Sequence, residues 1–361
     1  MATMKEIAER LGVSLGTVSK GLNGGRDISE DLRQDILNAA VELGYTSRRS
    51  KKKDQRKLAV LIANMDFETE DSFGYEIVLG FRQAAFAADW AVDVLPITRD
   101  FQQAHPFDAF IKQEKWSGVF LLGFSFEDPW LTECRTTQVP TVLLDNSVNE
   151  NPHVAGIGTD SNEAMNMSVT CLTELGHEKI AFLNGSAGSR ISDHRMAAYL
   201  SAMHRHRLPI DPNLAVYGYY VADAAKYHVP GFLDRGTTAI LCGNDLIASG
   251  VIECCRSLGF SVPEDVSVIG FDDIPLAEQL APPLTTIRQP RAALGRSGCH
   301  TLLSIIDHVP VSRTLLRPSL IVRGSVAAAR PRVAKKQEND QDSVERVAPE
   351  LYRIYAHMPM F

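Results

Sequence analysis

Residues 3–22 read TMKEIAERLGVSLGTVSKGL, and this stretch decides how the chain begins to fold. Thr3 and Glu6 have the spacing of a capping box, in which each side chain bonds the other residue's backbone N–H. Gly12 then favours the end of a helix, and Ser14 can cap a second helix that runs to about Leu22. Apolar residues lie between Glu6 and Gly12 at helical spacing, namely Ile7, Ala8 and Leu11. The stretch therefore predicts two short helices joined by a tight turn.

A third helix completes this unit. Asn23-Gly24-Gly25 ends the second helix, and Ser29 can cap the next one. The apolar stripe of that third helix consists of Leu32, Ile36, Leu37, Ala40 and Leu43. Because the first two helices are joined too tightly for an ordinary helical hairpin, the pattern is typical of a helix-turn-helix.

The outer side of the second helix favours DNA binding over the alternative, a helical cap that only packs on another domain. Val18 and Leu22 suffice to anchor this helix, so its other side chains can face outward. They are short, polar or basic, and such a surface can approach base edges and phosphates. The candidate DNA contacts of the head are Thr3, Ser14, Leu15, Gly16, Thr17, Ser19, Lys20 and Asn23.

The same region resembles the head of LacI/GalR-type transcriptional repressors. The resemblance rests on residues 3–8, 12–14, 17–20, 22–23 and 43–45, and it continues to about residue 330. It implies a regulator that binds operator DNA through the head. It also implies a sensor domain similar to periplasmic sugar-binding proteins.

The distribution of charge agrees with a nucleic-acid partner. The 361-residue chain has a net charge of −7, yet residues 1–57 hold 12 Lys and Arg against 8 Asp and Glu. Residues 48–57 alone hold seven basic residues and one acid. A basic segment ahead of an acidic body is the charge asymmetry expected of a protein that binds nucleic acid.

Residues 47–57 form a basic linker, or neck, between a head at 1–46 and the body. Family members usually carry a hinge helix here, with a leucine that wedges into the minor groove. No apolar residue stands between Tyr45 and Leu58, so the sequence does not support a wedge. A solvated linker and an arm that neutralises phosphates both remain open, and they are compatible. The candidate phosphate contacts are Arg48, Arg49, Lys51, Lys52 and Lys53.

The body, residues 58–330, alternates apolar strand-like runs with helical patterns. The runs lie at 58–63, 92–95, 118–122, 141–145, 180–183, 214–217, 239–242 and 266–270. Such alternation implies parallel βαβ units with helices on both faces. The predicted fold class is α+α/β, a small all-α helix-turn-helix head followed by two doubly wound parallel α/β lobes of periplasmic-binding-protein type. We expect the first lobe at about 58–146 plus 285–330 and the second at about 160–284. The tail, 331–361, is polar in its first half and is expected to be partly disordered.

Ligands of such sheets bind beyond the carboxyl ends of the strands. Arg195 and Asp272 match the effector-binding arginine and aspartate of the family, and Asp145, Asn244 and Tyr220 also fall on family pocket positions. Phe73 is a further candidate for the same pocket. Fixed acceptors and a guanidinium fork suit a hydroxyl-rich ligand, so the expected effector is a carbohydrate. Asp245 and Asp273 also follow strands, but for them the sequence favours helix N-caps.

Other classes of protein find little support. The sequence has no dinucleotide fingerprint, phosphate loop or G-x-S-x-G elbow, so we expect neither an enzyme nor a cofactor. Six scattered cysteines without a CxxC pair indicate free thiols in a reducing cytoplasm rather than a metal site. The absence of a signal peptide and of an apolar run of about 18 residues argues against a membrane.

The sequence thus predicts a cytoplasmic, homodimeric repressor that binds double-stranded operator DNA under the control of a small effector. A dimer would place two such helices in successive major grooves, about 34–36 Å apart. The alternative is a sugar-binding module with a DNA-binding head but no effector control. The sequence does not name the effector, its sign or the operator.

Overall fold

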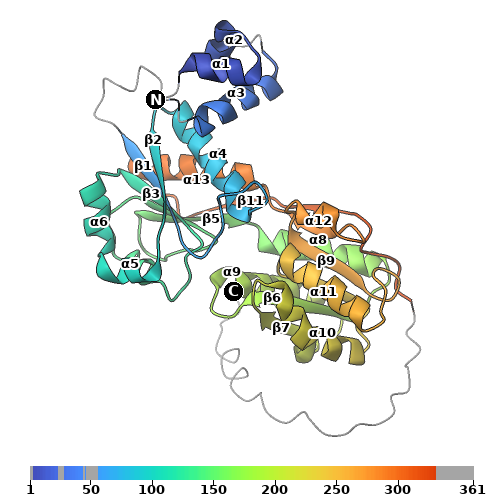
Figure 1. The fold of residues 1–361 in the computed structure, drawn as a ribbon. Helices are drawn as coiled ribbons and strands as arrows, with labels where there is room; N and C mark the ends of the chain where they lie inside the picture. Colours follow the sequence, from blue (N-terminus) through green and yellow to red (C-terminus); the bar gives the residue numbers. More distant parts are fainter. Residues whose placement is uncertain (1–2, 23–27, 44, 46–55, 331–361) are drawn as a thin grey trace. The chain divides into compact units, whose positions relative to one another are not determined.

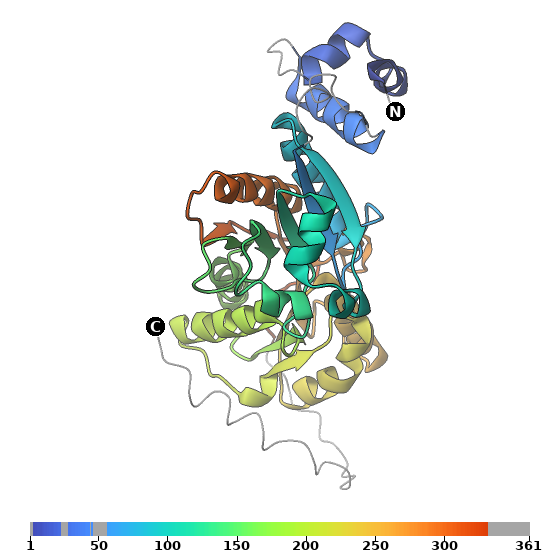
Figure 2. The same cartoon turned by 90° about the vertical axis from the view of Figure 1, so that its left-hand side faces the viewer.

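A computed structural model describes residues 3–22, 28–43, 45 and 56–330. Asn23, the five basic neck candidates and the tail lie outside these ranges. Three helices form the head, α1 (Met4–Leu11), α2 (Leu15–Leu22) and α3 (Glu30–Glu42) (Figures 1 and 2). The predicted capping box between Thr3 and Glu6 is present, and Gly12 ends α1 with a φ of 62°. The small core of the head is centred on Ile7, Val18 and Ile36.

The first sheet of the body is entirely parallel and has the strand order β11-β5-β4-β3-β1-β2. Its strands are β1 (Lys57–Ile62), β2 (Ala91–Pro96), β3 (Gly118–Leu122), β4 (Thr141–Leu144), β5 (Val154–Thr159) and β11 (Arg313–Leu316). The helices of this lobe are α4 (Phe73–Ala87), α5 (Arg99–Ala104), α6 (Phe107–Glu114), α7 (Pro129–Glu133) and α13 (Arg291–Ile306). Residues 99–114 hold two helices, α5 and α6, and Pro106 is the N-cap of the second.

The second sheet has the order β12-β10-β9-β8-β6-β7, with only the β12–β10 pair antiparallel. Its strands are β6 (Ile180–Ser186), β7 (Ala215–Gly218), β8 (Ala239–Cys242), β9 (Ser267–Asp272), β10 (Thr285–Arg288) and β12 (Ser319–Ile321). Its helices are α8 (Ser161–Glu174), α9 (Arg190–Arg205), α10 (Ala225–Asp234), α11 (Asp245–Ser257) and α12 (Leu276–Gln279), with 3-10 turns at Pro212–Leu214 and Ala222–Ala224.

The sheets correct the expected lobe boundaries. β5 lies in the first sheet, although its residues were expected within a crossing between lobes. β10 and β12 lie in the second sheet, although 285–330 was expected to belong wholly to the first lobe. The chain therefore crosses between lobes after β5, after β10 and after β11. An apolar pattern identifies a buried strand but not its neighbour, which long-range packing decides.

Helices α4 and α13 pack against each other through two glycines (Figure 1). A Cβ atom at Gly80 would lie 2.1 Å from the Ala292 carbonyl oxygen, and one at Gly295 would lie 1.9 Å from the Ile77 carbonyl oxygen. Only glycine permits this approach, which fixes the start of α13 beside α4. In the part of the chain that the structure describes, no helix is long and apolar enough to cross a membrane.

Candidate functional site

The exposed side of α2 is built as the sequence predicts. Ser14 Oγ accepts a hydrogen bond of 3.0 Å from the Thr17 backbone N–H and so caps the helix. Val18 is fully buried, whereas Leu15 is 51% exposed and Lys20 is also exposed. Gly16 faces open space, since a Cβ there would meet only Ser14 Oγ at 3.6 Å. The helix thus keeps one face in the head core and offers the other to a partner.

Two of the candidate DNA contacts already have structural roles. The Thr3 backbone N–H donates to Glu6 Oε2 at 2.6 Å, and its hydroxyl accepts from the Glu6 N–H at 3.3 Å. Ser14 Oγ also shares a hydrogen bond of 2.8 Å with Thr17 Oγ1. These bonds position the start of each helix. Direct contact with DNA remains a prediction for all residues of this set.

The second part of the site is a cavity of about 640 Å³ between the two lobes. The six effector candidates line it together, although they come from both lobes and from 200 residues of chain; they are Phe73, Asp145, Arg195, Tyr220, Asn244 and Asp272. Its wall also includes residues that the sequence analysis did not select, among them Asn64, Arg99, Asp128, Tyr219 and Gln289.

Asp145 enters the cavity from the first lobe, directly after β4. Its backbone has a φ of 54°, and its Oδ1 is buried without a hydrogen-bond partner among the described residues. Burial raises the pKa of this carboxyl, while Arg195 and Arg313 oppose the shift. Gly158 allows the close approach, since a Cβ there would lie 2.6 Å from Asp145 Oδ1. An unsatisfied buried acceptor is costly, so this atom is suited to a ligand's hydroxyl group.

Arg195 enters from the second lobe, on α9. Its side chain is held by a 2.6 Å hydrogen bond from Nη1 to the Gly243 carbonyl oxygen and by stacking 3.8 Å from the centre of the Phe271 ring. Nη2 lies 4.0 Å from Asp272 Oδ1. Nε is buried and has no acceptor within the described part of the chain. The Nε–H group is thus the donor left for a ligand, while the other contacts fix the direction of the guanidinium group.

Asp272 ends β9 with a φ of 110°. Burial raises the pKa of its carboxyl to about 6, against the opposing effect of Arg195 and of a hydrogen bond from Gln289. Gln289 Nε2 donates to Asp272 Oδ1 at 2.7 Å, and Gln289 Oε1 accepts from Thr159 Oγ1 at 2.6 Å. Gln289 thereby ties this carboxylate to the first lobe.

Two other candidates are partly committed to the fold. The Tyr220 hydroxyl is hydrogen-bonded to Ser192 Oγ at 2.8 Å, and burial raises the pKa of the phenol. Asn244 is the N-cap of α11, where its Oδ1 accepts from the Ile247 N–H at 2.8 Å. Both still line the cavity. Their structural roles position them for a ligand and do not replace ligand contact.

The expectation that Asp245 and Asp273 cap helices is wrong. Asp245 is the first residue of α11 and accepts hydrogen bonds from the Ile274 N–H at 2.9 Å and from Thr286 Oγ1 at 2.6 Å. Asp273 accepts from Arg288 Nε at 2.5 Å and from Arg323 Nη1 at 2.8 Å. Asn244 occupies the N-cap of α11, so Asp245 lies inside the helix.

The first-lobe wall contains a group that the sequence analysis missed. Asp128 is 3% exposed and accepts hydrogen bonds from the Ser125 N–H at 2.7 Å and from Asn64 Nδ2 at 3.3 Å. Asn64 follows β1, and Asp128 lies in the segment after β3. The rule about the carboxyl ends of strands, applied to the second lobe, would have found both in the first.

The described residues form neither a metal site nor a disulfide bond. They contain no group of three or more His, Cys, Asp and Glu side chains placed to hold a metal ion. All six cysteines are free thiols, and five of them are buried.

Comparison with known proteins covers both parts of the site. The model of bacterial regulatory proteins of the lacI family matches residues 3–47, and that of a periplasmic binding protein-like domain matches residues 169–326. The HTH-type transcriptional repressor CytR of Escherichia coli is 30% identical over 336 residues, or 91% of this chain and 97% of that one. The probable HTH-type transcriptional repressor ExuR of Bacillus subtilis is 28% identical over 90% of this chain and 98% of its own.

Solved structures give the same result. A complex of the transcriptional regulator CelR with cellobiose is 26% identical, with a TM-score of 0.66, over 90% of this chain and 100% of that one. The Lac repressor dimer bound to operator and to the anti-inducer ONPF is 25% identical, with a TM-score of 0.64, over 91% and 99%.

Proposed function

Starting from the fact that the chain belongs to the lacI family of bacterial regulatory proteins, and is therefore a DNA-binding transcriptional regulator, we propose that its operator affinity is set by a small ligand bound between its lobes. The regulator acts as a repressor, as its relatives CytR and ExuR are named. It works as a homodimer, because pseudo-palindromic operators are read by two equivalent helices one turn apart.

The α2 helix supports direct reading of the operator. Its exposed face carries Leu15, Gly16 and Lys20, while Val18 holds the opposite face in the head core. An apolar side chain can contact a thymine methyl group, and a lysine can contact guanine or phosphate. A glycine between them allows the backbone to approach the groove closely. This combination supports base reading rather than phosphate contact alone.

One observation carries the ligand-binding half of the proposal. Asp145 and Arg195, from opposite lobes, each present a buried polar atom without a partner among the described residues, and both line the same cavity. A ligand with neighbouring hydroxyl groups would satisfy both atoms at once. Bridging the lobes would favour one arrangement of them, which is the differential contact that an allosteric effector requires.

The ligand class is a carbohydrate or a derivative of one. Carboxylates and a guanidinium fork discriminate hydroxyl groups, and the aromatic rings of Phe73 and Tyr220 in the same wall suit the apolar face of a sugar ring. Ligand binding without turnover is part of the proposal, as is a cytoplasmic location, where the operator DNA is found.

Operator binding in the presence and absence of sugars tests the proposal. A thermal-shift screen first identifies ligands, since a ligand at a hundred times its Kd adds about 2.7 kcal/mol to the stability. Footprinting on the protein's own promoter is then repeated over a titration of each ligand. A change in operator occupancy supports the proposal. A ligand that binds and leaves occupancy unchanged would favour a sugar-binding module without effector control.

A further inference from the structure

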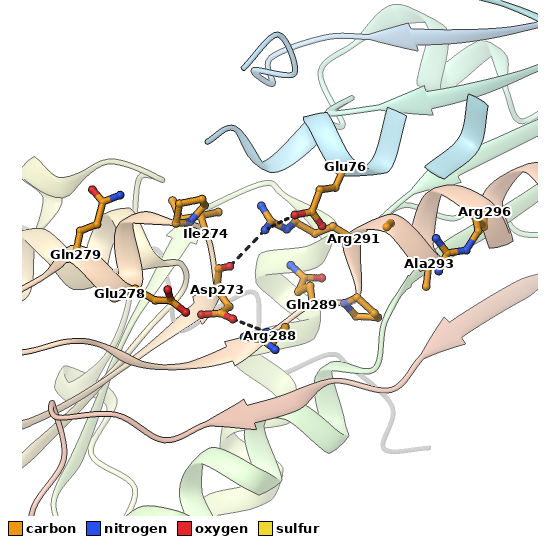
Figure 3. A pocket seen from close by; sticks show the side chains of 13 residues that line it. Glu76, Asp273, Ile274, Glu278, Gln279, Arg288, Gln289, Arg291, Ala293 and Arg296 are labelled. Carbon is orange, nitrogen blue, oxygen red and sulfur yellow. Dashed lines mark hydrogen bonds and ion pairs between the residues drawn. The ribbon is translucent and has the colours of Figure 1, made fainter. Parts of the chain in front are cut away.

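A second cavity, of about 510 Å³, shares the wall residue Gln289 with the 640 Å³ cavity between the lobes, which we call the effector cavity. We name it the hinge cavity, because it is formed where the chain crosses from β10 to α13 (Figure 3). Its wall consists of Glu76, residues 273–275, Glu278, Gln279, residues 288–293 and Arg296. Gln289 is common to both linings. The consecutive residues Asp272 and Asp273 face the two cavities separately.

The acidic side chains of the hinge cavity are already neutralised. Glu76 Oε1 accepts from Arg291 Nη2 at 3.0 Å. Asp273 is held by Arg288 and by Arg323, the latter at 2.8 Å. Glu278 Oε1 accepts from Arg323 Nη2 at 2.8 Å. All three carboxylates are thus paired with arginines, with Arg323 shared between Asp273 and Glu278, and none is left to attract a cation.

One N–H donor group and one positive charge, in contrast, are left over. Arg291 is only 7% exposed, yet its Nη1 has no acceptor among the described residues. Arg296, five residues further along α13 and so nearly one and a half turns away, is exposed and pairs with no residue that the structure describes. Figure 3 shows both arginines on the same helix, with Arg291 reaching toward Glu76 and Asp273.

The first turn of α13 adds to this potential. The helix has 16 residues, and its N-cap is Pro290, which supplies no side-chain hydrogen bond to the turn. The residues of that turn, Arg291, Ala292 and Ala293, line the cavity. The Arg291 N–H donates to the Gln289 carbonyl oxygen at 2.8 Å, which leaves the N–H groups of Ala292 and Ala293. The N-terminus of a helix with uncapped N–H groups carries a partial positive charge and favours anions.

We propose that the hinge cavity binds a small oxyanion, a carboxylate or a phosphate, between Arg291, Arg296 and the first turn of α13. The anion supplies the acceptor that Arg291 Nη1 lacks, in a charge-assisted hydrogen bond. Arg291 touches both lobes, since it also contacts the Asp273 carbonyl oxygen at 3.4 Å. An anion here therefore acts on the hinge itself, and Gln289 connects that hinge to Asp272 in the effector cavity.

Calorimetry on the full-length protein tests this proposal with inorganic phosphate in one arm and malonate in the other. Sodium chloride keeps the ionic strength constant, so that general screening is the same throughout. Arg296→Gln should weaken binding by about tenfold to a hundredfold, the loss of one charge-assisted bond. Arg317→Gln is the matched control, because this arginine is 87% exposed and pairs with Glu163 outside the cavity.

The two arms distinguish the sources of the anion. Binding of phosphate alone assigns a phosphate group, and binding of malonate alone assigns a carboxylate. The absence of binding in both arms overturns the proposal, as does binding that Arg296→Gln leaves unchanged. Arg291→Gln should also abolish binding, but it removes the contact to Glu76, so the conclusion rests on Arg296. Neither DNA nor sugar enters the assay, and its outcome is independent of the proposed repressor function.

Discussion

Replacing Asp272 with asparagine should make the ligand-free protein more stable and less responsive to its effector. Asparagine keeps an oxygen that can accept from Gln289 Nε2, and it tolerates the φ of 110° at this position. What it removes is a buried negative charge. Arg195 stabilises that charge only partly, because its Nη2 lies 4.0 Å away and the pKa of the carboxyl still stands above its ordinary value.

The size of the effect follows from the raised pKa. A rise from 3.8 to about 6 corresponds to about 3 kcal/mol lost from the folded state once the carboxyl is ionised in both states. Because the folded protein holds this proton more tightly than the unfolded chain, stability falls as the pH rises from about 4 to about 6 and then stays low. Asp272→Asn should therefore gain about 3 kcal/mol at pH 7.5, or roughly 6 °C in Tm, and about half of that at pH 5.

Chemical denaturation of wild type and variant at pH 5 and pH 7.5 measures both numbers. Asp89→Asn is the control, because Asp89 also has a positive φ, of 61°, but is exposed to solvent. Two results would contradict the reasoning: a variant no more stable than wild type at pH 7.5, or a gain in unfolding free energy that is the same at pH 5. Either would show that ionised Asp272 does not destabilise the folded protein as its burial predicts. A variant that is more stable but responds to effector like wild type would remove Asp272 from the ligand contacts.

Four further predictions concern other parts of the molecule. Leu15→Ala should relax base preference more than it weakens non-specific binding, and an equal loss on operator and random DNA would contradict base reading. Replacing Lys51, Lys52 and Lys53 with glutamine should reduce the slope of log K for DNA binding against log salt concentration by up to about 0.9 per lost contact. An unchanged slope would show that the neck is only a linker. Gly295→Ala should destabilise the first lobe by about 3 kcal/mol or more, measured by denaturation, because its Cβ would meet the Ile77 carbonyl oxygen at 1.9 Å. Arg195→Ala should lose effector response and also stability, measured by denaturation, because the buried Asp272 and Asp145 carboxyl groups would lose the guanidinium that offsets part of their burial cost. A variant as stable as wild type would show that Arg195 acts only in ligand binding.

Features with local causes could be predicted from the sequence alone. A capping box, a left-handed glycine and a serine cap are features of a few consecutive residues, and Thr3, Gly12 and Ser14 occupy these roles in the structure. Asp145, Asn244 and Asp272 were found because the carboxyl ends of parallel strands meet at one edge, a rule that needs only the order of strands and helices. Arg195 and Tyr220 came from the family resemblance, and Phe73 was an additional candidate. Combined with the family resemblance, this rule brought residues as distant as Phe73 and Asp272 to one cavity.

Features that depend on long-range packing could not be predicted without the folded structure. β10 and β12 joined the second sheet because strand neighbours are set by how the lobes pack, which an apolar run does not record. Asp245 and Asp273 became buried partners of distant side chains rather than helix caps, and Gln289 became the connection between two cavities. The unsatisfied atoms of Asp145, Arg195 and Arg291 exist only because folding removes them from water and brings no partner in exchange. Burial is a property of the whole packed chain, so no stretch of sequence contains it.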